Sequence, residues 1–302
     1  GLTDEGFGLL QRRFGAMLEN QRQSPRYLFG EKVRELTTSG HYSAKSLSAA
    51  DVQALDLQVM RRDYAARFGN AADFTFFMVG AFEEAAVVPM VEQWLASLPS
   101  TGPRRTAFRD MGMTFPKGIE KAVVTKGKEP ASQTAMAFFA DTGLNELEMH
   151  RARAASTLVG MRLRDILREQ LGGTYGVSVN YGNTAPQKGY GTMTVSFGSA
   201  PDRVETLQKA VLDEVTRLRA EGPSADDLQK VQEMERRELE TSATQNQYWL
   251  GSLQTVHMLG WDAATIARRV ERTNALTVPI LHETIKKYFP LDRYVVVTLK
   301  PE

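Results

Sequence analysis

The sequence places two hydrogen-bond donors on either side of a glycine turn. Residues 163–181 read LRDILREQLGGTYGVSVNY, in which a basic helix end runs into Gly172-Gly173 and then into a strand. Arg168 lies on the last predicted helical turn, and Tyr175 follows seven residues later. A guanidinium and a phenolic hydroxyl both donate hydrogen bonds to oxygen. If the turn folds them together, the pair suits a peptide carbonyl or an oxyanion that develops from one.

The same two residues also have a purely structural interpretation. Arg168 can complement the partial negative charge at a helix C-terminus. Tyr175 can be an ordinary half-buried strand residue whose hydroxyl reaches water. The residue types and their spacing leave both interpretations open.

No local metal site is visible in the sequence. The chain has no cysteine and four histidines, and it contains neither an HExxH nor an HxxEH motif. His282-Glu283 is a near miss, because Lys286 stands where a second histidine would be and an ammonium group is a poor zinc ligand. We therefore expect His282 and Glu283 to face solvent on a terminal helix, and His150 to lie at the surface.

Composition excludes several other classes of protein. Lys and Arg number 37 against 36 Asp and Glu, so the formal net charge of +1 argues against a nucleic-acid binder that works by bulk charge. No apolar run approaches the roughly 20 residues of a membrane span. The sequence also has no G-x-S-x-G elbow, P-loop or dinucleotide-binding glycine loop. The absence of cysteine is compatible with either periplasm or cytosol.

Hydrophobic spacing predicts the elements that must position these residues. Helices are predicted at 2–20, 25–36, 56–68, 83–98, 146–170, 201–220, 224–243, 248–259 and 278–288, and strands at 74–79, 119–125, 132–139, 174–181, 190–197 and 294–299. This uneven alternation favours an α+β or mixed α/β architecture over a regular βαβ series. Proline, glycine and an Arg-Arg pair between residues 99 and 116 indicate a linker, which we place at 106–118.

The two ends of the chain resemble each other at an offset of 221 residues. At this offset Thr3 meets Ser224, Tyr27 meets Tyr248, and a helix, helix, turn, helix and strand recur in the same order. The strand at 74–79 then corresponds to 294–299, slipped by one residue. The simplest interpretation is a repeating unit of about 220 residues, of which the chain holds the rear part of one copy and a whole second copy. We therefore expect a fragment, in agreement with the missing initiator methionine.

Three stretches resemble one peptidase family. The sequence LREQLGGTYGVSV is similar to the C-terminal half of M16 zinc metallopeptidases, the insulinase/pitrilysin family. FTFFMVGAF followed by a helix that ends in WLASLP resembles the end of an M16 domain, and RLRAEGPSADDLQKV resembles a helix–turn–helix of these domains. The resemblance covers nearly the whole chain and is greatest for bacterial four-domain zinc proteases of the PqqL-like type.

The resemblance implies a fold and a domain layout. It predicts an α+β protein of tandem M16-type (LuxS/metallohydrolase-like) domains, with mainly antiparallel sheets flanked by helices and the first domain truncated. Residues 1–105 would be the rear part of the third of four domains, 106–118 a linker, and 119–302 the complete fourth domain. Family members bind zinc in the first domain, on HxxEH and a distal glutamate. The zinc would therefore be supplied by a missing N-terminal half, and this chain would bind none.

The resemblance also implies roles for the donor pair. Arg168 would hold a backbone oxygen of a peptide substrate, and Tyr175 would donate to the tetrahedral oxyanion. Asn180 and Tyr181 continue the strand and are weaker candidates for lining the substrate chamber, with ordinary strand positions as the alternative. The chain would then be the substrate-binding half that closes over a zinc-bearing half, and it would be inactive alone.

Two other functions remain open on the sequence alone. The chain can be a natural non-catalytic M16 subunit that pairs with a zinc-bearing partner, or a peptide-binding or structural protein without proteolysis. The truncated first repeat favours the half-enzyme, because a natural subunit should begin with a complete domain. The resemblance suggests a bacterial protein of the periplasm, with the cytoplasm as the alternative.

Overall fold

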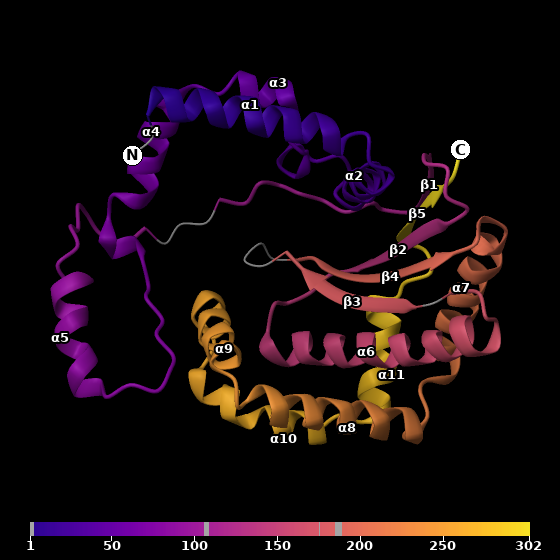
Figure 1. The fold of residues 1–302 in the computed structure, drawn as a ribbon. Coiled ribbons are helices and arrows are strands. Elements are labelled where there is room, and N and C mark those ends of the chain that lie inside the picture. The colour runs from indigo at the N-terminus through magenta and orange to yellow at the C-terminus, as the bar shows by residue number, and fades with distance from the viewer. Residues whose placement is uncertain (1–2, 106–108, 175, 185–188) are drawn as a thin grey trace. The chain divides into compact units, whose positions relative to one another are not determined.

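The chain folds into two compact units, each assembled from separate stretches of sequence. The computed structural model describes residues 3–105, 109–174, 176–184 and 189–302. The first unit comprises Gly1–Gln21, Leu47–Arg109 and Ser242–His257. The second comprises Arg22–Ser46, Asp110–Thr241 and Met258–Glu302. Figure 1 shows the elements of both, and each unit is described by itself.

The second unit is built around a five-stranded sheet with the strand order β1-β5-β2-β4-β3. The strands are β1 (Ile119–Thr125), β2 (Ser132–Ala140), β3 (Val177–Asn183), β4 (Gly191–Ser199) and β5 (Tyr294–Lys300). β1 runs parallel to β5, whereas the other neighbouring pairs are antiparallel. β5 has the sequence YVVVTLK and is buried along almost its whole length, since it lies inside the sheet and is covered on both faces.

Helices cover both faces of this sheet (Figure 1). α2 (Pro25–Thr37) covers one face, and α6 (Glu146–Arg164), α7 (Val204–Glu221) and α11 (Val278–Tyr288) cover the other. α8 (Ala225–Ser242) and α10 (Arg269–Asn274) lie on the side of α6 away from the sheet. The larger core lies on the face that α6, α7 and α11 cover, where Phe138 of β2 is fully buried. Phe29 of α2 packs on the other face against Val297 and Leu299. The predicted α+β class, with a mainly antiparallel sheet flanked by helices, is confirmed.

The described residues of the first unit are helical or irregular and contain no strand. The helices are α1 (Asp4–Gln21), α3 (Ala49–Gln53), α4 (Leu57–Phe68), α5 (Glu84–Trp94) and α9 (Asn246–Leu259). The strand predicted at 74–79 is therefore wrong for this structure. A strand satisfies its backbone groups only by pairing with neighbours, and the described part of this unit provides none.

The predicted internal repeat is confirmed at the level of elements and caps. α1 and α8 have the same bounds when shifted by 221 residues, and α4 begins 221 residues before α11. The caps recur as well: the Asp56 carboxylate accepts from the Val59 N–H at 2.9 Å, and the Thr277 hydroxyl accepts from the Ile280 N–H at 3.4 Å. The two copies thus share local chemistry as well as the order of their helices.

The second helix of each copy belongs to the unit that contains the other copy. α2 packs in the second unit, where Leu36 adjoins the clusters of Val295 and Val297. α9 belongs to the first unit, where His257 lies 3.0 Å from the Thr75 hydroxyl and edge-on to the Phe77 ring. Because Leu36 and His257 correspond, Thr75 and Phe77 take the places of Val295 and Val297. This correspondence is the one expected if the last segment is slipped by one residue, although residues 74–79 form no strand.

Candidate functional site

Arg168 lies on a widened helical turn that directly follows α6. The sequence predicts one α-helix through Gln170, but residues Asp165–Gln170 form a π-helical turn. The Leu171 N–H donates to the Ile166 carbonyl, five residues earlier, at 3.0 Å. Such turns are rare and are frequent at functional sites. The turn keeps Leu167 fully buried and leaves Arg168 exposed.

Two glycines and one arginine hold this helix end in place. Gly172 has φ +57°, which a side chain would disfavour, and its N–H bonds to the Arg168 carbonyl. A Cβ on Gly173 would lie 2.6 Å from Leu207 Cδ2, so only glycine lets the turn approach α7 this closely. Arg203 Nη2 donates to the Leu171 carbonyl at 2.8 Å. The position of Arg168 is therefore set by contacts with the start of α7.

The Arg168 side chain is available for a ligand. It is 54% exposed, and an ion pair joins its Nε to Glu169 Oε1 at 3.5 Å. Exposed pairs of this kind are worth about 0–1 kcal/mol, so a carbonyl or carboxylate oxygen can replace Glu169 at little cost.

Tyr175 lies outside the described residues. Its neighbours Thr174 and Gly176 are joined through the Thr174 hydroxyl. The Thr174 side chain is buried, donates to the Gly176 carbonyl at 2.9 Å and accepts from the Gly176 N–H at 3.2 Å. These two hydrogen bonds join Thr174 to Gly176.

Asn180 and Tyr181 lie on opposite faces of β3. The Tyr181 ring packs on the face that α6 and α11 cover, edge-on to Tyr288 with ring centroids 5.6 Å apart. Asn180 is exposed on the other face, and in the sheet register it is paired with Thr194. The structure does not bring the two side chains together, and a contact of either with a substrate stays a prediction.

Sequence reasoning missed a hydrogen-bonded cluster around Glu148, a partly buried carboxylate at the start of α6. Glu148 Oε1 lies 2.8 Å from the Tyr288 hydroxyl and also binds Lys287, while Oε2 accepts from the Gly143 N–H at 3.0 Å. Burial opposes ionisation of this carboxyl, but its hydrogen bonds outweigh burial and lower the pKa of Glu148. Burial raises the pKa of Tyr288. The cluster fastens α11 to α6.

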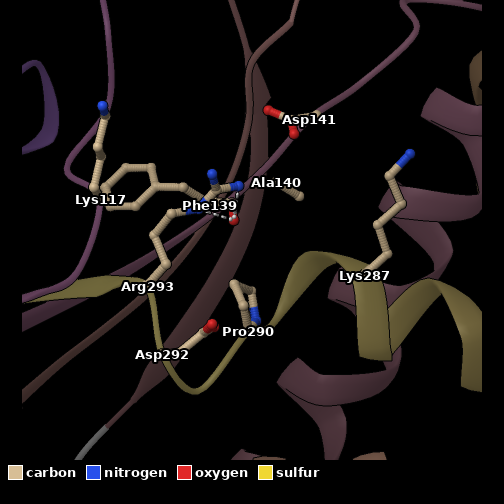
Figure 2. A pocket seen from close by; sticks show the side chains of 8 residues that line it. All are labelled: Lys117, Phe139, Ala140, Asp141, Lys287, Pro290, Asp292 and Arg293. Atoms are coloured by element: carbon tan, nitrogen blue, oxygen red, sulfur yellow. Dashed lines mark hydrogen bonds between the residues drawn. The ribbon is translucent and has the colours of Figure 1, made fainter.

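A mixed-charge hollow of about 460 Å³ lies beside this cluster (Figure 2). It is lined by Lys117, Phe139, Ala140, Asp141, Lys287, Pro290, Asp292 and Arg293. Arg293 Nη2 donates to the Phe139 carbonyl at 3.0 Å, and Lys287 is bound to Glu148. Since two of its cations already have partners and carboxylates also line it, the hollow does not select a ligand of one charge.

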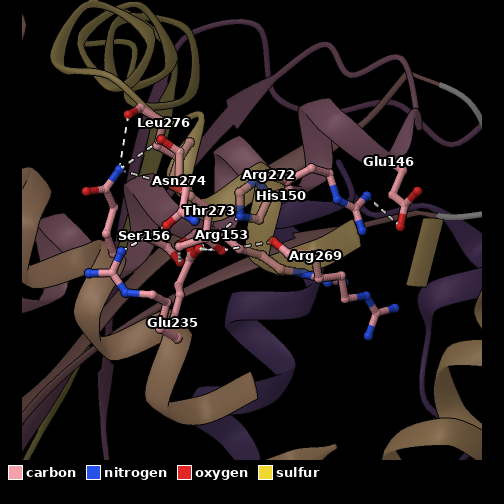
Figure 3. A network of polar contacts seen from close by, with 12 residues as sticks. Glu146, His150, Arg153, Ser156, Glu235, Arg269, Arg272, Thr273, Asn274 and Leu276 are labelled. Atoms are coloured by element: carbon pink, nitrogen blue, oxygen red, sulfur yellow. Dashed lines mark hydrogen bonds and ion pairs between the residues drawn. The ribbon is translucent and has the colours of Figure 1, made fainter. Parts of the chain in front are cut away.

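Two predictions about histidines are wrong. His150 is largely buried, and its Nε2 lies 2.9 Å from Glu235 Oε2, which also accepts from the Thr273 hydroxyl (Figure 3). His282 is partly buried because its Nε2 lies 2.8 Å from the Arg219 carbonyl, whereas Glu283 is exposed as expected. Helix packing, which the local sequence does not reveal, determines both positions.

The chain does not offer a zinc site in the part that the structure describes. Across residues 3–105, 109–174, 176–184 and 189–302, no group of three or more His, Cys, Asp or Glu side chains is placed to hold a metal ion. These residues therefore offer no place for a zinc ion, which the family resemblance assigns to a different part of the enzyme. Within the same residues, no helix is both long and apolar enough to cross a membrane.

Comparison with known proteins identifies one family. Residues 60–235 match the family model described as the peptidase M16 inactive domain. Among curated relatives, the zinc protease PQQL-like of Arabidopsis thaliana is 24% identical over 260 residues, which cover 82% of this chain and 27% of the relative. The probable zinc protease PqqL of Escherichia coli is 24% identical over 258 residues, which cover 83% and 26%. The chain thus spans about a quarter of their length.

Solved structures agree on the fold. The periplasmic protease PqqL from Escherichia coli superimposes with a TM-score of 0.80 at 21% identity, over 100% of this chain and 33% of that one. A peptidase M16 inactive domain from Pseudomonas fluorescens superimposes with a TM-score of 0.81 at 19% identity, over 99% of this chain and 71% of that one. At these identities the likeness shows the fold alone.

Proposed function

The chain belongs to the peptidase M16 family, and from that membership we propose that it is the substrate-binding C-terminal half of a zinc-dependent peptidase that acts on peptides. The curated relatives that carry zinc protease names are about four times as long as the aligned region. Such a length leaves room for a separate zinc-bearing half. The chain would then form one wall of the chamber that holds the peptide substrate.

The observation that carries the proposal is the exposed guanidinium of Arg168 on a rigid helix end. The π-helical turn, Gly173 and Arg203 fix the backbone beneath it. A well-supported backbone with an exposed, weakly paired head group is suited to anchoring a backbone oxygen of a peptide. Tyr175 is proposed as the second donor, directed at the oxyanion. Asn180 and Tyr181 are proposed only as secondary contacts.

Zinc is assigned to another part of the enzyme. The described residues provide no group that fits it, so the metal would be held by the N-terminal half of the same polypeptide or by a partner subunit. This chain would then contribute binding and orientation of the peptide, and no metal ligand. Alone, it should cleave nothing.

The internal repeat supports the proposed domain layout. We assign residues 1–105 to the rear part of a third domain, 106–118 to a linker, and 119–302 to a complete fourth domain. The PqqL structure from Escherichia coli is described as a periplasmic protease, and we propose the periplasm for this chain too, with the cytoplasm as the alternative.

Kinetics of the whole polypeptide test the proposed role of Arg168. Arg168→Ala should lower kcat/KM for a peptide substrate by roughly 10- to 1000-fold, as should Tyr175→Phe, if the donors act at the transition state. Arg164→Ala is the matched control, because Arg164 is exposed and lies one helical turn earlier. Equal kinetics for Arg168→Ala and Arg164→Ala would return Arg168 to the structural interpretation.

A non-catalytic subunit is the second candidate function. The matching family model is itself described as inactive, which suits a subunit that pairs with a separate zinc-bearing chain. The upstream coding sequence discriminates the two: an HxxEH motif in the same reading frame supports the half-enzyme, and its absence supports the subunit or a peptide-binding protein.

A further inference from the structure

Arg203 reaches the middle of the segment that separates the two proposed donors. It ends the short helical turn Pro201–Arg203, which directly precedes α7. Its Nη2 donates to the Leu171 carbonyl at 2.8 Å. Leu171 follows Arg168 by three residues and precedes Tyr175 by four. One side chain from a different element therefore holds the turn that carries Arg168.

The Leu171 carbonyl closes the helical segment, where carbonyls lack partners within the helix and carry its partial negative charge. The two glycine amides of the turn are used on other carbonyls. The Gly172 N–H donates to the Arg168 carbonyl at 3.1 Å. The Gly173 N–H donates to the Leu167 carbonyl at 3.0 Å. The guanidinium thus supplies a donor that the glycines do not, and a charged donor makes a stronger hydrogen bond than a neutral one.

The backbone of Arg203 is fixed by the core of the second unit. Its N–H donates to the Ala200 carbonyl at 3.0 Å. Val204 and Leu207 of α7 follow it and are both buried. Moving the start of α7 would expose these two side chains, which is costly. The Arg203 side chain therefore connects a fixed helix start to the turn.

The contact of Arg203 depends on a donated hydrogen and not on an ion pair. Within the part of the chain that the structure describes, Arg203 forms no ion pair, and its guanidinium binds the Leu171 carbonyl. A lysine at this position would keep a donor for that carbonyl, whereas a methionine of similar length would keep none. These two substitutions separate loss of the donor from loss of side-chain volume.

We propose that Arg203 is a positioning residue, which sets the direction in which the turn presents Arg168 and does not itself touch the substrate. It acts through the Leu171 carbonyl. The inference rests on the proposed function of Arg168 as a peptide anchor. A displacement of about 1 Å can cost on the order of 100-fold in rate. Loss of the Arg203 donor should therefore impair the anchor even though the Arg168 side chain is intact.

Hydrogen exchange in the 302-residue chain tests whether Arg203 holds the turn. Arg203→Met should speed exchange of the Gly172 and Gly173 amides at least about 10-fold, because the turn loses its external bond. Arg203→Lys should leave their exchange near the rate of the unsubstituted chain. Arg293→Met is the matched control, since it removes a guanidinium that donates to the Phe139 carbonyl. Phe139 pairs with the start of β4, whereas Arg203 follows the end of β4, so this control should not change exchange at the two glycines.

Kinetics of the whole polypeptide test the link to Arg168. Arg203→Met should lower kcat/KM for a peptide substrate at least about 10-fold, and Arg203→Lys should restore most of the loss. Arg293→Met should leave kcat/KM unchanged. In a double variant, Arg203→Met should add little to the loss caused by Arg168→Ala, because residues that act through one contact are not additive. A general loss of stability would instead multiply the two effects.

The positioning role is wrong if Arg203→Met leaves exchange at Gly172 and Gly173 unchanged, or if its kcat/KM equals that of Arg293→Met. Multiplicative effects of Arg203→Met and Arg168→Ala would also contradict it. Normal kcat/KM for Arg168→Ala would overturn the proposed function and this role with it. Impaired Arg168→Ala together with normal Arg203→Met would overturn the positioning role alone. If Arg203→Met does not fold, Arg203→Lys decides, because faster exchange of the two glycines in that variant would contradict the role of the donor.

Discussion

Gln11 and Gln232 make the same set of hydrogen bonds 221 residues apart. Gln11 Nε2 donates to the carbonyls of Val52, Gln53 and Leu55, at 3.1, 3.2 and 3.4 Å. Gln232 Nε2 donates to the carbonyls of Thr273, Asn274 and Leu276, at 3.1, 3.5 and 3.2 Å. In each copy one amide thus collects the carbonyls at the end of a short helix. The repeat is therefore a repeat of specific bonds as well as of helices.

Removing one of these amides should destabilise its unit. Gln232→Leu keeps the size of the side chain but leaves the three carbonyls without their donor, and an unsatisfied buried polar group costs about 1–3 kcal/mol. Urea unfolding of the second unit would measure the loss. Gln229→Leu is the control, since Gln229 lies on the same helix outside this set of bonds. Equal stability of the two variants would show that the shared bonds are incidental.

A buried carboxylate should make the stability of the second unit depend on pH. Glu214 of α7 binds Arg162 of α6 at 3.1 Å and Arg217 at 2.7 Å. Burial opposes its ionisation, but the hydrogen bonds from the two arginines outweigh burial, so the pKa of Glu214 is lowered. The stabilisation is complete above the unfolded-state pKa of about 4.3 and is lost as pH falls through the lower folded-state value.

Comparison with Glu214→Gln measures this contribution. At neutral pH the variant should be less stable than the unsubstituted chain by about 1.5–3 kcal/mol, the range for a hydrogen bond to a charged group. The difference should shrink as pH falls below about 4. Glu205→Gln, at an exposed position on the same helix, should show no such difference. A pH-independent difference would mean that packing, and not ionisation, is responsible.

The close approach at Gly173 should tolerate no side chain. Gly173→Ala would place a methyl group 2.6 Å from Leu207 Cδ2, so the buried Leu207 side chain or the turn must shift, at a cost of about 1–3 kcal/mol. Gly176→Ala is the control, because a Cβ on Gly176 would have no atom within 4 Å. Thermal unfolding of both variants tests this. A Tm for Gly173→Ala as high as that of the control would contradict the tight packing.

The chain alone should bind no stoichiometric zinc. The described residues offer no suitable group of ligands, and the sequence has no HxxEH motif. Metal analysis after dialysis against micromolar zinc should therefore find much less than one equivalent. Retention of one tightly held zinc per chain would contradict the assignment of the metal to another part of the enzyme.

Local signals in the sequence predicted much of the fold. Hydrophobic spacing predicted most of the helices and the strands of the sheet, and Gly172-Gly173 marked the end of the helical segment that carries Arg168. The strand at 74–79 failed because strand formation depends on neighbours that local sequence does not reveal. The pairing of His150 with Glu235 joins residues 85 positions apart and has no local signal. The sequence predicted the candidate site from the types and spacing of Arg168 and Tyr175. It did not predict the π-helical turn or the contact of Arg203 with the Leu171 carbonyl.

The most direct test of the central claim is to mix this chain with a separately purified zinc-bearing N-terminal half and to follow cleavage of a peptide. The account predicts that neither piece cleaves alone, that the mixture does, and that Arg168→Ala in this chain lowers the rate at least about 10-fold. An N-terminal half that cleaves equally well with and without this chain would contradict it.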